Sequence, residues 1–147
     1  MSEITINASE IDNLQIPELE KTNLHNLFNL LMKIATKNGD KIKLDIVGGV
    51  LNKSWPRKDI DVVIKMEQEN GSSELDKAEK SFNKLVQFTH QVENDSNGFF
   101  QLGRKHPPYP SSQFDSDNIN ILEHNGSLEI NPQLGTTIEL IRRSDNE

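Results

Sequence analysis

The chain has no cysteine among its 147 residues, and this absence removes several kinds of chemistry. A disulfide framework, a thiolate zinc site and a cysteine nucleophile are all excluded. Aromatic residues make up 5% of the chain and hydrophobic residues 33%, which is low for a compact enzyme and predicts long polar loops. Apolar runs fall well short of the roughly 18 residues that a membrane-spanning helix needs, so we expect no contact with a membrane.

Positive charge is also scarce. The 16 Lys and Arg residues are outnumbered by 23 Asp and Glu residues, giving a net charge of −7 and a pI near 5.1. General binding of duplex nucleic acid is therefore not expected, because it needs clustered Lys and Arg. A small anionic substrate remains compatible, since a bound metal can invert the local charge. The first residues lack the basic and apolar regions of a signal peptide, so we expect a cytoplasmic protein.

The length predicts one domain spanning residues 1–147, with residues 1–16 as a loose arm or short strand. Leu24, Leu27, Leu31 and Ile34 recur at helical spacing, which predicts a helix over residues 17–37 that ends at Asn38-Gly39. A second helix is expected to follow Ser73, a good N-cap residue. The order helix, strand, strand, helix and further strands predicts an α+β fold, or a mixed α/β sheet. The expected strands are 42–46, 59–66, 98–102, 119–123, 127–130 and 136–141; 119–123 and 127–130 form a hairpin, and 106–118 is a loop.

The most informative stretch is Asp45-Ile46-Val47-Gly48-Gly49, followed by the strand of residues 59–64. Aliphatic side chains alternate along that strand with Asp59 and Asp61, so the two acids project together from the face opposite the core. Acids two positions apart on a strand lie roughly 7 Å apart at Cα, within reach of one divalent cation or of a pair. Asp is uncommon in strands and two on one face repel, a penalty that a cation removes; the plain alternative is a solvated surface strand.

Gly48 and Gly49 add a second element to this pattern. Glycines at a strand end let backbone N–H groups approach a phosphate with no Cβ in the way, although a Gly-Gly pair alone also suits a tight turn. The spacing of the pair to Asp59 and Asp61 makes the pattern specific. A phosphate cradle beside a metal-binding acid pair is the minimum equipment for nucleotidyl transfer.

Val47, Gly48, Gly49, Asp59 and Asp61 resemble the signature of the nucleotidyltransferase superfamily, which includes DNA polymerase beta, the minimal nucleotidyltransferases and the tRNA CCA-adding enzymes. That signature is a hydrophobic residue, Gly-Gly or Gly-Ser, a connection, and then an acid, a hydrophobic residue and a second acid. The resemblance implies Mg²⁺ (or Mn²⁺) held by the acids. It also implies transfer of a nucleoside monophosphate from a nucleotide triphosphate, lying against the glycines, to an acceptor hydroxyl that the sequence does not identify.

Within the superfamily, the pattern is most similar to the head domain of the CCA-adding and poly(A) polymerase branch. That branch has a later strand of hydrophobic-Glu-hydrophobic pattern with an arginine shortly after, and residues 138–143 are similar. The branch usually continues its double glycine with a Val-Arg-Asp element, where this chain has Leu51-Asn52-Lys53, and its connection to the acids is longer. The superfamily is therefore indicated, and tRNA CCA addition is not.

Three residues are candidates for the third carboxylate. Glu139 lies between aliphatic neighbours and copies the pattern of Asp59 and Asp61, and Glu129 has the same local pattern. Glu123 fits less well, because it shares a strand face with isoleucines. The resemblance of the last strand favours Glu139, which we expect roughly within 8 Å of both aspartates.

Several other residues have both a functional and a plain interpretation. Arg57 and Lys58 precede the acid strand and are candidates for nucleotide binding, or are solvated turn residues. Arg142 and Arg143 could contact a sugar or triphosphate, although basic residues near a terminus are more often exposed. Trp55 could stack on a base, but a loop anchor on the core is the favoured interpretation.

Two rival classes of function remain open at this point. The first is a non-catalytic binding or regulatory protein with the same fold, such as a toxin–antitoxin partner or a pseudoenzyme, which would have a protein partner. The altered Leu51-Asn52-Lys53 element favours this class, and the intact pair of Asp59 and Asp61 opposes it. The second is a plain structural domain, in which the glycines and the acids would coincide by chance.

Overall fold

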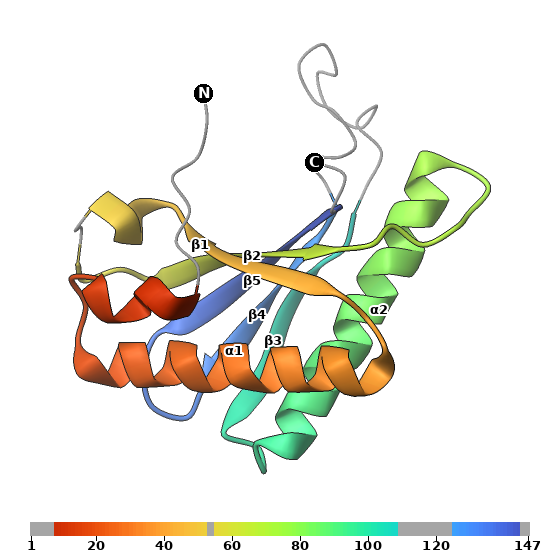
Figure 1. Ribbon diagram of the computed structural model, residues 1–147. Coiled ribbons are helices and arrows are strands. Elements are labelled where there is room, and N and C mark those ends of the chain that lie inside the picture. Colours follow the sequence, from red (N-terminus) through yellow and green to blue (C-terminus); the bar gives the residue numbers. More distant parts are fainter. Residues whose placement is uncertain (1–7, 53–54, 109–124, 145–147) are drawn as a thin grey trace.

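The computed structural model describes residues 8–52, 55–108 and 125–144, which form an α+β fold (Figure 1). Two long helices and two short 3-10 helices accompany a five-stranded mixed sheet. In chain order the elements are η1 (Ala8–Asn13), α1 (Glu18–Asn38), β1 (Ile42–Val47), η2 (Gly49–Asn52), β2 (Asp59–Met66), α2 (Glu74–Asp95), β3 (Phe100–His106), β4 (Ser127–Pro132) and β5 (Thr137–Ser144). The predicted fold class is thereby confirmed.

The strands lie in the order β1-β2-β5-β4-β3. Strand β2 runs antiparallel to β1 and parallel to β5, and β4 runs antiparallel to both β5 and β3. The last strand in the chain therefore lies in the middle of the sheet, next to the strand that carries the two aspartates.

Helix α1 begins and ends where the sequence predicts, to within one residue. Pro17 precedes it with an extended backbone, and Gly39 ends it in the left-handed region at φ 75°. Gly39 suits this position because it has no Cβ to clash, and its N–H bonds the carbonyl of Thr36 at 3.2 Å. The predicted leucine stripe is buried, with Leu24 and Leu31 fully inaccessible.

Helix α2 begins after Ser73, whose hydroxyl accepts the N–H of Asp76 at 3.0 Å, as a helix N-cap should. Its inward face includes Phe82, Phe88 and Val92, all buried in the core. Both long helices lie on the same side of the sheet (Figure 1). The apolar face of the sheet and the apolar stripes of α1 and α2 thus form one core.

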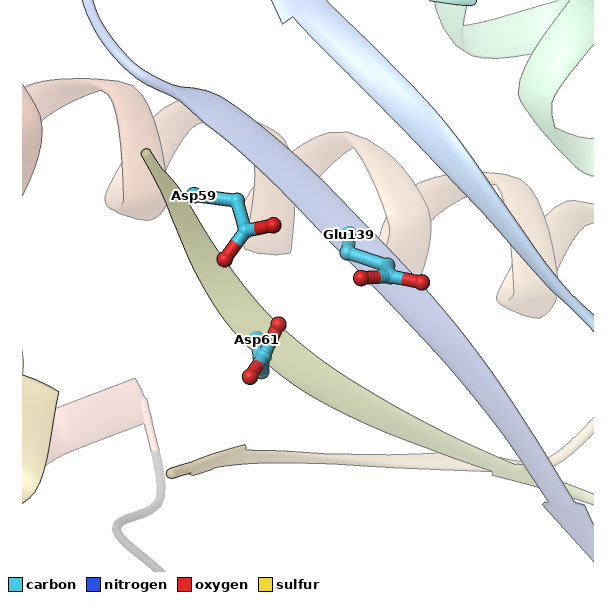
Figure 2. Close-up of side chains that lie close together, drawn as sticks. All are labelled: Asp59, Asp61 and Glu139. Atoms are coloured by element: carbon cyan, nitrogen blue, oxygen red, sulfur yellow. The ribbon is translucent and has the colours of Figure 1, made fainter. Parts of the chain in front are cut away.

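The second face of the sheet carries no helix among the described residues. Along β2 the buried core positions alternate with Asp59, Asp61, Val63 and Lys65, so these four side chains belong to the face away from the helices. Val63 is buried but lies outside the main core cluster, as expected for that face. Figure 2 shows the aspartates on the near side of the strands, with a helix behind them.

Several expectations about the elements need correction or fall outside the described residues. Residues 8–16 are not a loose arm, because Ile11 in η1 and Leu14 directly after it lie in the core at 0% and 5% exposure. Strand β3 runs from Phe100 to His106 rather than over 98–102. Strand β5 is longer than the expected 136–141. The expected strand at 119–123 and residues 109–118 of the expected loop lie outside the described residues, and β4 pairs with β3 and β5.

Neither of the long helices in the described part of the chain has both the length and the apolar character needed to cross a membrane.

Candidate metal centre

The candidate metal centre consists of Asp59 and Asp61 on β2 and Glu139 on β5. In the parallel pairing of these strands, Asp61 and Glu139 are direct Cα partners, and Asp59 pairs with Thr137. One carboxylate oxygen from each acid lies within 4.8 Å of the other two, and all three side chains are half-buried. The side chains gather on one face of the two strands (Figure 2). The predicted proximity of Glu139 to the two aspartates is confirmed.

Polar contacts from α1 fix the start of β5 and therefore the register of Glu139. The buried carboxylate of Glu20 accepts both the backbone N–H of Thr136, at 3.0 Å, and its hydroxyl, at 2.9 Å. The side-chain amide of Asn23 donates to the carbonyl of Leu134 at 2.7 Å. A one-residue slip of β5 would point the side chain of Glu139 into the core. The contacts from α1 to Leu134 and Thr136, in the turn between β4 and β5, therefore also preserve the acid cluster.

Strand β4 adds polar groups beside Glu139. The hydroxyl of Ser127 donates to Oε2 of Glu139 at 2.8 Å and helps to orient the carboxylate. Glu129 is the direct Cα partner of Glu139, so it shares the same face, but it is not part of the group of three. Ser127 was not among the residues predicted from the sequence; its only signal was the alternation that places it on the same face of β4 as Glu129. The third candidate, Glu123, lies outside the described residues.

The electrostatics of the cluster centre on Asp61. Partial burial, followed by the negative charges of Asp59 and then Glu139, raises the pKa of Asp61 from 3.8 to about 6. The positive charge of Arg57 opposes this rise. The folded protein therefore holds three carboxylates close together at a free-energy cost, which a divalent cation would relieve.

The glycine turn lies against the acids. Gly48 has φ 84°, and a Cβ built on it would lie 3.0 Å from Oδ2 of Asp61. Gly49 begins η2 with the guanidinium of Arg57 so close that any side chain there would have to displace it. The structure thus brings Gly48, Gly49 and Arg57 to the edge of the acid cluster. Lys58 is exposed, and no described contact brings it into the cluster.

The structure gives different positions to the remaining candidate residues, Trp55, Arg142 and Arg143. Trp55 packs against the hydrophobic core, which confirms its interpretation as a loop anchor. Arg142 is fully buried, so the expectation of an exposed residue is wrong. It belongs to the helix-covered face of β5 and donates to the side-chain oxygens of Asn125, at 2.9 Å, and Gln68, at 2.5 Å. It therefore cannot contact a ligand at the acids, whereas Arg143 belongs to the acids' own face.

The donor set fits a hard divalent cation. Mg²⁺ prefers oxygen ligands at about 2.0–2.1 Å, so two ligands on opposite sides of one ion lie about 4.2 Å apart. The 4.8 Å limit on the separation of the three oxygens is close to that value. Asp59, Asp61 and Glu139 could hold one Mg²⁺ or Mn²⁺ with small rotations of their side chains, leaving other positions for water or a phosphate.

Comparison of the chain with protein-family models, with curated proteins and with solved structures finds no match. The residues of the site are therefore the basis on which a function can be assigned.

Proposed function

We propose that the protein is a metal-dependent nucleotidyltransferase of the superfamily that its sequence resembles. It would move a nucleoside monophosphate from a nucleotide triphosphate to an acceptor hydroxyl. The observation that carries this proposal is that Glu139, from a distant part of the chain, joins Asp59 and Asp61 next to the glycine turn at Gly48. A solvated surface strand would need neither the third acid nor the adjacent glycine turn.

In this proposal Asp59, Asp61 and Glu139 hold Mg²⁺ or Mn²⁺. The bound cation would supply Lewis-acid chemistry, lowering the negative charge around the α-phosphate and on the pyrophosphate that leaves. Gly48 and Gly49 would give the β- and γ-phosphates access to backbone N–H groups, and Arg57, which already lies over Gly49, would add a positive charge.

The transfer itself forms a bond between the acceptor oxygen and the α-phosphorus and breaks the bond from that phosphorus to pyrophosphate. The acceptor hydroxyl loses its proton in this step, and a carboxylate of the cluster would take it up. Glu139 suits this task because Ser127 orients its carboxylate with a hydrogen bond.

Calorimetric titration of the protein with each nucleotide triphosphate, with and without Mg²⁺, tests this proposal. We expect binding of at least one nucleotide that requires the metal and is lost in Asp61→Asn, which keeps the shape of the side chain and removes its charge. Glu79→Gln, an exposed substitution on α2, is the matched control and should bind as the parent does. Binding by Asp61→Asn at the parent's affinity, or no metal-dependent binding by the parent, would contradict the proposal.

A non-catalytic regulatory protein with the same site is the second candidate. The observation that favours it is Leu51-Asn52-Lys53 in place of the expected Val-Arg-Asp element, which changes the charge next to the glycine turn. The two candidates differ in turnover. Release of pyrophosphate from a bound nucleotide, measured over hours with candidate acceptors present, supports the enzyme, whereas stable metal-dependent binding without release supports the regulator.

A further inference from the structure

Three basic residues lie side by side across the sheet, beyond the acid cluster. Lys43 on β1 is the direct Cα partner of Lys65 on β2, and Lys65 is the direct partner of Arg143 on β5. Neighbouring strands lie about 4.8 Å apart, so the three positions form one continuous row, which we call the basic row. Such a row is notable in a chain whose net charge is −7.

The basic row belongs to the same face of the sheet as the acids. On β5, Arg143 alternates with the buried residues of the helix-covered face and is in phase with Glu139. On β2, Lys65 is in phase with Asp61. Lys43 is exposed, and Lys65 and Arg143 are half-buried, so the row is accessible from the side on which the acids lie.

The glycine turn lies beside the acids, and the basic row lies further along the strands in the direction away from that turn. Val47 pairs with Asp61, and because β1 runs antiparallel to β2, Gly48 follows on the side of Asp61 that faces the start of β2, away from Lys65. Lys65 lies four residues in the other direction, which corresponds to roughly 13 Å along the strand. The face therefore presents a candidate triphosphate cradle beside the candidate metal ligands, with a row of positive charge further along the strands in the other direction.

The charges of the basic row are only partly balanced within the described residues. Like charges directly opposite one another on a sheet are destabilising. Asp45, a buried carboxylate on β1, lies two residues nearer the acids than Lys43 does. It supplies one negative charge to this part of the face. Lys43 and Arg143 form no ion pair with any residue in the described ranges. A bound anion would remove the mutual repulsion of the row.

We propose that Lys43, Lys65 and Arg143 form a phosphate-binding site, and that it holds a phosphate group of the acceptor. The acceptor role rests on the proposed function, whereas phosphate binding by the row does not. The row fits the acceptor better than the nucleotide donor, because the donor's triphosphate would extend from the metal toward Gly48, away from the row. The acceptor is accordingly a molecule with a phosphate roughly 13 Å from its reacting hydroxyl.

Two probes test the site without turnover, in buffer that contains EDTA. One is inorganic tripolyphosphate, followed by calorimetry, and the other is a short fluorescent oligonucleotide of unpaired pyrimidines, followed by anisotropy. We expect the parent to bind at least one of them at low salt. Lys43→Glu and Arg143→Glu should each weaken that binding about tenfold and lower the slope of log affinity against log salt by about 0.7 per lost phosphate contact.

Lys37→Glu is the matched control, because it changes the net charge equally at an exposed position on α1, on the helical side of the sheet. It should change the affinity less than twofold. Binding of tripolyphosphate, with or without the oligonucleotide, indicates a small phosphorylated acceptor, and binding of the oligonucleotide alone indicates the end of a single strand; either supports the site. An equal loss in Lys37→Glu, or no binding of either probe, would overturn it.

The proposed function can fail independently of this site. Lys43→Glu should keep the parent's metal-dependent nucleotide binding, because Lys43 lies far from the acids and the glycine turn. Asp61→Asn should keep the binding of the phosphate probes. If the parent binds the phosphate probes but no nucleotide, the proposed nucleotidyltransferase function is rejected and the basic row remains an anion site.

Discussion

Asp61 and Glu139 are direct partners in the parallel pairing of β2 and β5, and each carries its carboxylate on the face away from the helices. The pairing brings together two acids that are 78 positions apart in the chain. Their mutual repulsion contributes to the raised pKa of Asp61. Several consequences of this relationship can be measured.

Asp61→Asn should stabilise the protein when no divalent metal is present. The substitution removes a charge that burial and two neighbouring carboxylates disfavour, and we expect a gain of about 1 kcal/mol in the free energy of unfolding at neutral pH, after allowance for solvent exposure. Urea unfolding of parent and variant measures the difference, with Glu79→Gln as the neutral control. Addition of Mg²⁺ should raise the melting temperature of the parent and leave that of Asp61→Asn unchanged.

The contribution of Asp61 to stability without metal should fall as the pH rises through the range between 3.8 and about 6. In this range the folded protein keeps a proton on Asp61 that the unfolded chain releases, so the contribution of this group to the free energy of unfolding decreases with pH. The difference between parent and Asp61→Asn isolates this group. A difference that does not depend on pH would contradict the raised pKa.

Affinity for Mg²⁺ should show the opposite trend. Only the ionised cluster binds the cation well, so the affinity should rise up to about tenfold per pH unit below the pKa of about 6 and level off above it. Calorimetry near pH 6 in two buffers of different ionisation enthalpy should detect the proton that is released on binding. Equal apparent enthalpies in the two buffers would show that no proton is displaced.

Glu139→Gln and Glu129→Gln should separate the two described candidates for the third carboxylate. Glu139 belongs to the group of three, so its substitution should weaken Mg²⁺ binding at least tenfold. Glu129 faces Glu139 across β4 and β5 but lies outside that group, so its substitution should change metal affinity by less than a few-fold. The reverse order of effects would move the third ligand to Glu129.

Arg142 and Arg143 should differ sharply in their effect on stability. Arg142→Ala leaves a cavity and takes a hydrogen-bonded charge away from Asn125 and Gln68, and we expect a loss of about 3–5 kcal/mol. Arg143→Ala on the other face should cost less than about 1 kcal/mol. Denaturant unfolding of the two variants makes the comparison, and similar losses would contradict the opposite orientation of these neighbours.

The acid strand could be predicted from sequence because its pattern is local. Alternation over residues 59–66 sets both the strand and the face of Asp59 and Asp61, and β2 has the predicted bounds. Alternation also predicted which face of its strand carries Glu139. It did not predict that this strand pairs with β2, because strand order depends on pairings between residues far apart in the chain.

Other features carried a weaker signal. The edge strand β3 ends in exposed polar residues, so its second half has no apolar alternation to reveal it. The burial of Arg142 could have been found, since it is in phase with Ile138 and Leu140, but its charge and its place near the end of the chain argued for exposure. In residues 8–16 the sign of η1 was weak, because it consisted of Ile11 and Leu14, three positions apart.

The central place of β5 also bears on the order in which the site can form during synthesis. Strands β1 to β4 emerge from the ribosome before β5, yet β5 separates β2 from β4 in the sheet. Until it arrives, the nascent chain can pair β1 with β2 and β3 with β4, but each pair keeps an open edge. The two aspartates are thus synthesised well before Glu139, and the cluster of three acids becomes complete only when β5 joins the sheet.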